Sequence, residues 1–358
     1  MQFKDIKLNG LFLWNNRVYR QAVNRQNVLS GKPLSKQSRY KAFDPCEEVD
    51  ALIDVPITID SNLTWVNEYG QTHRTDGPAI TWSDGTMHWM INGNAHRTDG
   101  PAVITPSGIQ MWYINGKLHR TDGPAVEYPS GYKQWFIDGK MHRTDGPAVE
   151  YPEGRKEWWF ENKQHRLDGP AVVVDVKGNN PLHIELKEWY QNNKRHRVDG
   201  PAVIMKRQDG KTCQSQWWFE GKLHRTDGPA VYDMDGSEDW YLNGKLHRTD
   251  GPAQIREGGD QQWWQNGLRH RIGGPAIVYP KSTRVDWYVK GKLHRTDGPA
   301  IEYEPGYGRW YYRGKQHRAD GPADVLRDGN NRYWFNDKRV DQFTYWILVN
   351  SKRKRKDK

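Results

Sequence analysis

Hydrophobic and polar positions recur along most of this chain with a period of 23 residues. In one period, Trp112-Tyr113-Ile114 is a short run of strand-forming residues, Asn115-Gly116 follows it, and Lys117-Leu118-His119 continues the chain. Asn-Gly is the preferred pair for a type I′ turn, because both turn positions require positive φ. The pattern therefore predicts a small antiparallel hairpin in which Trp112 is opposite His119.

The side chains of such a hairpin alternate between its two faces. One face then carries Trp112, Ile114, Lys117 and His119, whereas Tyr113 and Leu118 lie on the other. A further strand begins at Ala125, after a stretch rich in turn-forming residues, and Pro129-Ser130-Gly131 turns the chain again. Each period is thus predicted to contain a strand, a tight turn, a strand and a second turn.

A His-Arg-x-Asp-Gly-Pro-Ala signature follows each predicted hairpin. Its His-Arg pair begins at eleven positions: 73, 96, 119, 142, 165, 196, 224, 247, 270, 294 and 317. Asp-Gly-Pro-Ala completes ten copies, and in the ninth Gly273 stands where the Asp is expected. A Trp stands seven residues before the His in ten copies, and the first copy, with Trp65, is off register. A fixed period of this kind indicates a repeat protein whose units bury their apolar surface against their neighbours.

We therefore predict an all-β fold, an elongated and twisted antiparallel sheet of about eleven to twelve tandem β-hairpin repeats. Residues 1–60 are predicted to form a small β-barrel-like N-terminal module, in which Phe3–Tyr19 contributes two strands around an Asn-Asn turn. The alternative for this segment is the N-terminal cap that an open sheet needs against edge pairing. The repeat array covers 61–332, a C-terminal capping hairpin covers 333–350, and a basic disordered tail covers 351–358.

Two repeats are longer than the others. The stretch 172–187 adds eight residues to the spacing, and the stretch 205–216 adds five. Insertions in repeat arrays extend loops on one face. The two segments are therefore either partner-specific elements or neutral variation in loop length.

The repeat resembles the MORN repeat, and more closely its variants in phage, giant-virus and bacterial antitoxin-like proteins. The resemblance rests on the pattern W-x-x-[ND]-G-K-x-H, followed by an aliphatic strand and Y-P-x-G, as between Trp135 and Gly154. It covers residues 65 to about 335, and it implies a stack of hairpins. MORN repeats have a short His-Gly-x-Gly where this chain has the longer signature, so no ligand preference is carried over. The resemblance also implies a phage-encoded protein that binds or neutralises a host factor, in the host cytoplasm.

The composition agrees with thin, turn-rich β-structure. Only 35% of the residues are hydrophobic, and 18 Trp and 18 Tyr outnumber 8 Phe, so aromatic side chains supply most of the apolar surface. The net charge of +10 is concentrated at the ends, with +5 on residues 351–358 and +4 on residues 1–50. The array between them carries +1 and is close to neutral.

Two further features bear on the cellular environment. Cys46 and Cys213 are far apart and match no metal-binding spacing, which suits a reducing compartment with free thiols. The sequence contains no apolar stretch of the roughly 18 residues that a membrane span requires, and no signal-peptide pattern at its N-terminus. We expect a cytoplasmic protein without integral membrane contact.

The repeated signature is predicted to be structural rather than catalytic or metal-binding. Catalysis needs one set of unlike groups in a shaped pocket, whereas iteration supplies a row of identical groups. We expect each His to pack against the Trp opposite it, and the Arg and Asp of each signature to form a pair that fixes the turn. No cofactor is expected. The third and fourth copies supply the structural residues Trp112, His119, Arg120, Asp122, Gly123, Pro124, Trp135, His142, Arg143 and Asp145.

Two places stand out as candidate binding residues. Arg271, in the ninth copy, lacks its local acid, and the tail carries a run of cations: Lys352, Arg353, Lys354, Arg355 and Lys356. The favoured hypothesis is a non-enzymatic scaffold that binds a protein partner through its Trp and Tyr side chains. One alternative is a nucleic-acid-binding protein that uses the basic ends, above all the C-terminal tail. Another is association with an anionic membrane surface.

Overall fold

The computed structural model describes residues 11–14, 17–20, 55–59, 62–175 and 184–356. The chain divides into two compact units, Met1–Lys163 and Gln164–Lys358. The predicted array is therefore divided between two units. Because each repeat of such an array contacts its neighbours alone, a long array need not form one compact body.

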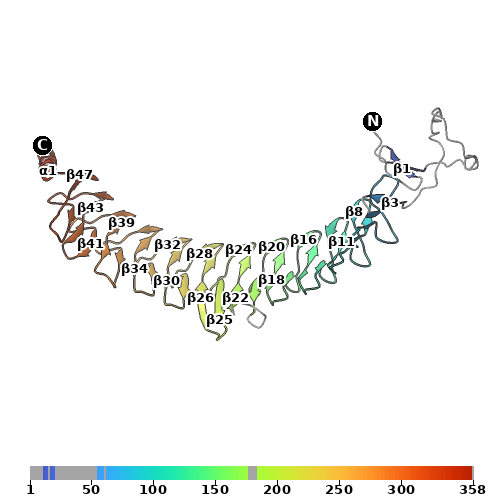
Figure 1. The fold of residues 1–358 in the computed structure, drawn as a ribbon. Helices are drawn as coiled ribbons and strands as arrows, with labels where there is room; N and C mark the ends of the chain where they lie inside the picture. The colour runs from blue at the N-terminus through green and yellow to red at the C-terminus, as the bar shows by residue number, and fades with distance from the viewer. Residues whose placement is uncertain (1–10, 15–16, 21–54, 60–61, 176–183, 357–358) are drawn as a thin grey trace, which may run out of the picture. The chain divides into compact units, whose positions relative to one another are not determined.

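In unit 1, the main sheet is antiparallel, and each strand pairs with the next strand of that sheet along the chain. Its strands are β3 (Val55–Ile59), β4 (Asn62–Val66), β5 (Ile80–Thr81), β6 (Met87–His88), β9 (Val103–Ile104), β10 (Gln110–Met111), β13 (Val126–Glu127), β14 (Lys133–Gln134), β17 (Val149–Glu150) and β18 (Lys156–Glu157). Small separate hairpins stand beside this sheet, one per repeat (Figure 1): β7 (Met90–Ile91) with β8 (Asn94–Ala95), β11 (Tyr113–Ile114) with β12 (Lys117–Leu118), and β15 (Phe136–Ile137) with β16 (Lys140–Met141). Strand β19 (Trp159–Phe160) is the last in this unit, and β20 (Lys163–Gln164) includes the last residue of unit 1 and the first of unit 2.

Unit 2 has the same plan. Its main sheet consists of β21 (Val172–Val174), β22 (Ile184–Glu188), β25 (Val203–Arg207), β26 (Thr212–Gln216), β29 (Val231–Asp233), β30 (Glu238–Asp239), β33 (Gln254–Ile255), β34 (Gln261–Gln262), β37 (Ile277–Val278), β38 (Val285–Asp286), β41 (Ile301–Glu304), β42 (Tyr307–Arg309) and β45 (Asp324–Val325). Its small hairpins are β23 (Tyr190–Gln191) with β24 (Lys194–Arg195), β27 (Trp218–Phe219) with β28 (Lys222–Leu223), β31 (Tyr241–Leu242) with β32 (Lys245–Leu246), β35 (Trp264–Gln265) with β36 (Leu268–Arg269), β39 (Tyr288–Val289) with β40 (Lys292–Leu293), β43 (Tyr311–Tyr312) with β44 (Lys315–Gln316), and β46 (Tyr333–Phe335) with β47 (Lys338–Val340).

The predicted hairpin and its turn are confirmed. Tyr113 pairs with Leu118 and Ile114 with Lys117, and the backbone N–H of His119 donates to the carbonyl of Trp112 at 3.0 Å. Asn115 and Gly116 have φ of 50° and 75°, as a type I′ turn requires. The first copy forms the same Trp–His pair, because the backbone N–H of His73 donates to the carbonyl of Trp65 at 2.9 Å. The turn between these two residues is one residue longer than in the other copies. The prediction of antiparallel tandem hairpins is therefore confirmed for both units.

The core of each unit is thin and lies where the small hairpins join the main sheet. The Ala that closes each signature is 0% exposed in every copy, and the Val or Ile that follows it is buried in most. In the third copy, the backbone N–H of Trp112 donates to the carbonyl of Ala125 at 2.8 Å, which ties the start of the hairpin to the sheet strand after the signature. An alanine at this place allows the hairpin backbone to approach the sheet closely.

The ends of the chain and the longer repeats differ from the predictions. Strands β1 (Leu11–Trp14) and β2 (Arg17–Arg20) form the expected hairpin, whereas the remainder of the predicted module up to residue 54 lies outside the described residues. Strand β3 pairs with β4 and so belongs to the repeat sheet, which therefore begins before residue 61. The insertion at 205–216 lengthens strands β25 and β26 rather than a loop, because its polar and apolar residues continue the sheet ladder. Of the insertion at 172–187, residues 176–183 lie outside the described part.

The C-terminal prediction was partly wrong. Residues 333–340 form the expected hairpin, but helix α1 (Gln342–Lys356) follows it, where a hairpin to residue 350 and a disordered tail were predicted. Asp341 caps this helix, because its carboxylate accepts the backbone N–H of Thr344 at 2.8 Å and its hydroxyl at 2.6 Å. Tyr345 is fully buried and Val349, one turn later, is 6% exposed, so this side of the helix closes the end of unit 2. The apolar run therefore follows a helical period rather than an alternating one.

Candidate functional site: the signature loops

In ten of the eleven copies, the signature arginine lies over the Trp ring of its own repeat. In the third copy, the Arg120 guanidinium carbon is 4.1 Å from the centre of the Trp112 ring. The Gly123 backbone covers the opposite side, since a methyl group placed on Gly123 would lie 2.8 Å from that carbon. The guanidinium is thus held between an aromatic ring and a glycine, and this close approach explains why the signature contains Gly at a place without positive φ.

Hydrogen bonds fix the same guanidinium at both of its edges. Nε of Arg120 donates to Oδ1 of Asp122 at 2.9 Å, and Nη1 donates to the carbonyl of Pro124 at 3.2 Å. The hydrogen bond from Arg120, with its positive charge, holds the pKa of Asp122 below its usual value. The predicted turn-fixing pair is confirmed, and the Trp ring and the proline carbonyl complete the set of contacts.

The geometry repeats in the other copies with little variation. In the ten copies whose Trp and Arg belong to one unit, the guanidinium carbon lies 3.9–4.3 Å from the Trp ring centre. The Arg to Asp distance is 2.7–3.0 Å in all ten copies that have the acid. In those copies the Arg side chains are 16–25% exposed and the Asp side chains 70–81% exposed. The row of aspartates therefore faces solvent above a row of half-buried arginines.

The signature histidine has a different role from the one predicted. Nδ1 of His119 accepts the backbone N–H of Asp138 at 3.2 Å, and it lies 2.9 Å from Oδ1 of the same residue. Asp138 begins the turn of the next small hairpin, so the His links one repeat to the following one. The side chain that lies over the ring of the opposite Trp is the signature Arg. In the fourth copy, Arg143 stacks on Trp135 and donates to Asp145, and the backbone N–H of His142 donates to the carbonyl of Trp135 at 3.1 Å. The His142 ring there lies 4.6 Å from the ring of Phe160.

The loop tips differ between the two units. The residue between Arg and Asp is Thr in all four complete signatures of unit 1, at Thr75, Thr98, Thr121 and Thr144. Three of the seven signatures assigned to unit 2 carry a large apolar residue there instead. Leu167 is 77% exposed, Val198 is 81% exposed and Ile272 is 84% exposed. Their side chains add almost nothing to the core, so folding does not explain their apolar character.

The ninth copy keeps the stacked arginine without the acid. Arg271 lies 3.9 Å from the Trp263 ring centre and donates through Nη1 to the carbonyl of Pro275 at 3.1 Å. Gly273 replaces the Asp and has φ of 76°, and a methyl group built on it would meet nothing within 4 Å. The structure thus places this predicted binding residue in the usual stack, beside open space where the other copies hold a carboxylate.

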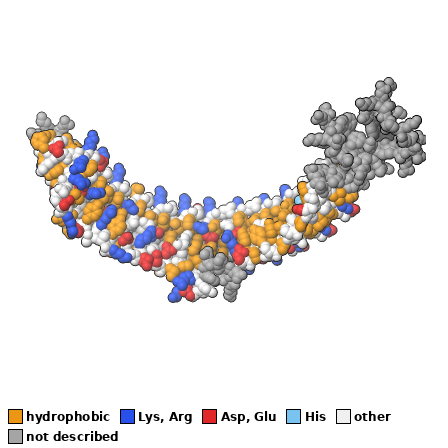
Figure 2. All heavy atoms as spheres, viewed as in Figure 1, with side chains coloured by type: hydrophobic (Ala, Val, Ile, Leu, Met, Phe, Trp, Pro, Cys, Tyr) orange, Lys and Arg blue, Asp and Glu red, His pale blue; other side chains and the backbone are white. Residues whose placement is uncertain are grey.

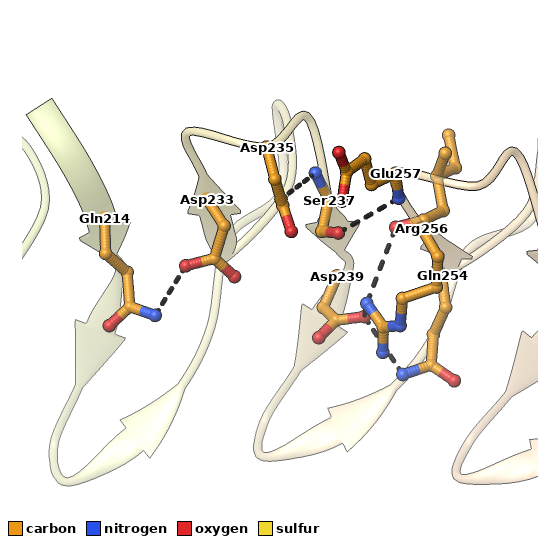
Figure 3. A network of polar contacts seen from close by, with 9 residues as sticks. Gln214, Asp233, Asp235, Ser237, Asp239, Gln254, Arg256 and Glu257 are labelled. Atoms are coloured by element: carbon orange, nitrogen blue, oxygen red, sulfur yellow. Dashed lines mark hydrogen bonds and ion pairs between the residues drawn. The ribbon is translucent and has the colours of Figure 1, made fainter.

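Acidic side chains immediately before the repeat Trp are buried or partly buried, which the sequence pattern did not predict. Asp239, immediately before Trp240, is 18% exposed in its side chain and accepts hydrogen bonds from Arg256 at 2.8 Å and Gln254 at 2.9 Å (Figure 3). In unit 1, Glu157 stands at the same place in its repeat, is 4% exposed, and pairs with Arg155. Acids before the Trp offered a signal, but nothing in the sequence showed that this position faces the space between hairpin and sheet.

A basic surface lies on the last small hairpins, although the sequence pattern did not predict it. The turns of the last three small hairpins carry exposed cations, which we call the C-terminal basic edge: Lys290, Lys292, Arg313, Lys315, Lys338 and Arg339. Figure 2 shows Lys and Arg side chains gathered in this part of unit 2. The signature aspartates balance the charge of these cations, so the net charge of the array is close to zero. The cations lie on hairpin turns and the aspartates on signature loops, and the net charge therefore does not reveal the basic surface. Lys352, Arg353, Lys354, Arg355 and Lys356 follow in α1, and their side chains lie outside the described part.

Comparison with known proteins adds no relative. No protein-family model matches the chain, and no curated protein matches it at a significant level. Within the part of the chain that the structure describes, no group of three or more His, Cys, Asp or Glu side chains could hold a metal ion. No helix among the described residues is long and apolar enough to cross a membrane.

Proposed function

We propose that this chain is a non-enzymatic repeat scaffold that binds a protein partner through the signature loops of unit 2. The observation that carries the proposal is the exposure of Leu167, Val198 and Ile272 at loop tips where unit 1 has only threonine. Leu167 and Val198 belong to successive signatures, which brings two apolar tips onto the same row of loops. Arg197, beside Val198, stacks on Trp189 and donates to Asp199, which fixes the loop that carries this apolar tip.

The energetics favour a protein surface as the ligand. Burial of one such aliphatic side chain in an interface is worth about 1.5–3 kcal/mol, whereas its exposure gains nothing for the free protein. Loops that are already ordered lose little conformational entropy on binding. The signature groups, in contrast, satisfy one another in repeated internal contacts, which supports a structural role rather than catalysis. The resemblance to MORN-like proteins supports the finer proposal of a phage-encoded protein that neutralises a host factor in the host cytoplasm.

The test replaces the apolar tips with the residue that the other repeats use. The full chain and its Leu167→Thr, Val198→Thr, Ile272→Thr triple variant are immobilised and exposed to nuclease-treated bacterial lysate, and retained proteins are identified and quantified by mass spectrometry. We expect one protein to be retained by the full chain and at least tenfold less of it by the triple variant. Met234→Thr is the matched control, because Met234 is 50% exposed and lies outside the signature loops. Equal retention by the full chain and the triple variant would contradict the proposal.

The C-terminal basic edge favours a second candidate function, nucleic-acid binding. Its exposed cations are Lys290, Lys292, Arg313, Lys315, Lys338 and Arg339, and Asp337 is the one acid on the same three turns. Such a patch neutralises phosphates and releases counterions, so its affinity falls steeply with salt. The cations of α1 at 352–356 extend the basic sequence.

Fluorescence anisotropy with a labelled 20-base-pair DNA, over a range of salt concentrations, tests this candidate. Four Gln substitutions on the edge should weaken binding more than tenfold, and should reduce the slope of log K against log salt by about 0.9 for each phosphate that the variant no longer neutralises. The edge substitutions are Lys290→Gln, Lys292→Gln, Arg313→Gln and Lys315→Gln. The matched control removes the same charge from other hairpins: Lys117→Gln, Lys140→Gln, Lys222→Gln and Lys245→Gln. Equal weakening by both sets would rule out a specific edge, and a chain that ends at Asn350 measures the part played by α1.

A further inference from the structure

Arg271 is held in place by the same contacts as the other signature arginines. It stacks on Trp263, Pro275 accepts its Nη1, and a methyl group on Gly274 would lie 2.9 Å from its guanidinium carbon. The side chain therefore keeps its fixed orientation although the acid of its own loop is missing. The guanidinium of Arg271 can therefore receive a ligand without a change of side-chain conformation.

No carboxylate among the described residues accepts a hydrogen bond from Arg271. The signature Asp is replaced by Gly273. A second acid, two residues after the signature Ala, also contacts the Arg in some copies, such as Glu127 at 3.2 Å and Glu302 at 2.7 Å. In the ninth copy this place is taken by Val278. Arg271 thus differs from the ten other signature arginines in lacking both acids.

Solvent can reach the vacant place beside Arg271. In the other copies the corresponding Asp side chains are 70–81% exposed, although they lie 2.7–3.0 Å from Nε of the Arg. In unit 1, an open cleft of about 510 Å³ lies between the signature loops of the third and fourth copies, so these two loops leave space between them. Beside the vacant place, Ile272 is 84% exposed and can contact the apolar part of a bound chain.

We propose that Arg271 binds a carboxylate of the partner protein, which takes the place of the missing signature aspartate. This inference rests on the proposed protein-binding function and names the chemistry of one contact within it. The ten complete copies show the geometry: a carboxylate oxygen accepts from Nε while the guanidinium stays stacked on the Trp. A pre-ordered guanidinium loses little entropy when it forms that bond.

The complete copies favour a carboxylate over a phosphate, because the group that Nε of the signature Arg meets in each of them is a carboxylate oxygen. Asp250 and Asp297, in the signatures on either side, are paired with their own arginines at 2.9 Å and 3.0 Å, so neither supplies the acid that Arg271 lacks. The carboxylate can come from an Asp or Glu side chain or from the C-terminus of the partner.

The experiment follows the Nε–Hε resonances of arginine in the full chain by NMR, and Arg271→Gln assigns the Arg271 signal. The probes are acetyl-Ala-Glu-Ala-amide, its Gln analogue, acetyl-Ala-Ala-Ala with a free C-terminus, and inorganic phosphate. We expect saturable movement of the Arg271 signal with the Glu peptide or with the free C-terminus, and the stronger of the two identifies the source. The Gln analogue should leave the signal in place. Movement no larger than that of the paired Arg295, or tighter binding of phosphate, would overturn the proposal.

Gly273→Asp restores the sequence of the other copies and supplies the carboxylate internally once the loop leaves the φ of 76° that Gly273 adopts and that no signature aspartate shares. We expect it to weaken Glu-peptide binding at least tenfold, and unchanged binding would refute the site. Arg271→Gln should abolish binding in the same way, and it keeps the test decisive if the Gly273→Asp loop is perturbed.

The two proposals fail separately. Protein capture that depends on the apolar tips but not on Gly273→Asp leaves the scaffold function and removes the carboxylate site. If the peptides bind at Arg271 but protein capture does not depend on the apolar tips, the carboxylate site stands and the scaffold function is contradicted.

Discussion

The substitution Gly123→Ala tests whether the arginine–tryptophan stack holds a repeat together. The added methyl group would lie 2.8 Å from the guanidinium carbon of Arg120 and 3.1 Å from its Nε and Nη2. Real contacts of this kind are longer, so the guanidinium has to move away from the glycine. Trp112 blocks movement in the opposite direction, because its ring centre is 4.1 Å away. Arg120 must therefore leave the stack or the loop must shift.

The expected cost follows from two opposing effects. Overpacking of a well-filled site costs about 1–3 kcal/mol. Replacement of Gly by Ala also restricts the unfolded chain, which favours folding by about 0.4–1 kcal/mol where the native φ suits alanine. Gly123 has no positive φ, so this gain applies to it. We expect a net local destabilisation of about 1–2 kcal/mol.

Amide hydrogen exchange is the suitable assay, because repeat proteins can open locally. The reporter is the N–H of Trp112, which donates to the carbonyl of Ala125 at 2.8 Å. Its protection should fall about tenfold, since about 1.4 kcal/mol corresponds to one power of ten. Gly258→Ala is the control: its methyl group would lie 3.5 Å from Nζ of Lys281, an ordinary contact, so protection near it should be unchanged or higher. Unchanged protection at Trp112 would show that the arginine moves without cost and that the stack does not hold the repeat.

Three other measurements check different contacts. The Arg hydrogen bonds lower the pKa of the signature aspartates, such as Asp122, in nine copies, so their stabilisation is present above the ordinary value of 3.8 and is lost as the pH falls through the lower folded value. Chemical unfolding should thus show constant stability from about pH 7 to 5 and a decline below about pH 4, and a stability that rises on acidification would contradict this. The variant His119→Ala removes the acceptor for the N–H of Asp138 and should raise its exchange rate by the equivalent of about 0.5–1.5 kcal/mol, with no effect if the contact is unimportant. The variant Asp239→Ala leaves the half-buried Arg256 without its carboxylate and should lower the melting temperature, whereas an unchanged melting temperature would mean that water replaces the pair.

Much of the fold could be predicted from the sequence because its rules are local. The Asn-Gly turn fixes the register of the hairpin, since a two-residue turn leaves one way to pair Ile114 with Lys117. The constant period then repeats that solution along the chain. The prediction was wrong at helix α1, because an apolar run such as Phe343–Val349 is compatible with both a strand period and a helical period. The burial of Tyr345 against the rest of unit 2 selects the helix.

The sequence identified the signature residues, but it did not identify their partners. It predicted the pairing of Arg120 with Asp122, because the two are adjacent in one turn. It placed His119 on Trp112, whereas the structure places Arg120 there and directs His119 to the next repeat. Both assignments satisfy the spacing, and only the path of the loop between hairpin and sheet distinguishes them.

The sequence by itself therefore determined the repeat, the hairpin register and the unusual ninth copy, because each depends on residues that are close in the chain. The tertiary structure decided which side chains face solvent and which face the sheet. The way successive loops cross the hairpins determines three features of the structure. Leu167 is exposed, Glu157 is buried, and the place beside Arg271 is vacant. Contacts between repeats determine how the loops cross, such as the hydrogen bond from the backbone N–H of Asp138 to Nδ1 of His119. The sequence pattern of a single repeat does not predict such contacts.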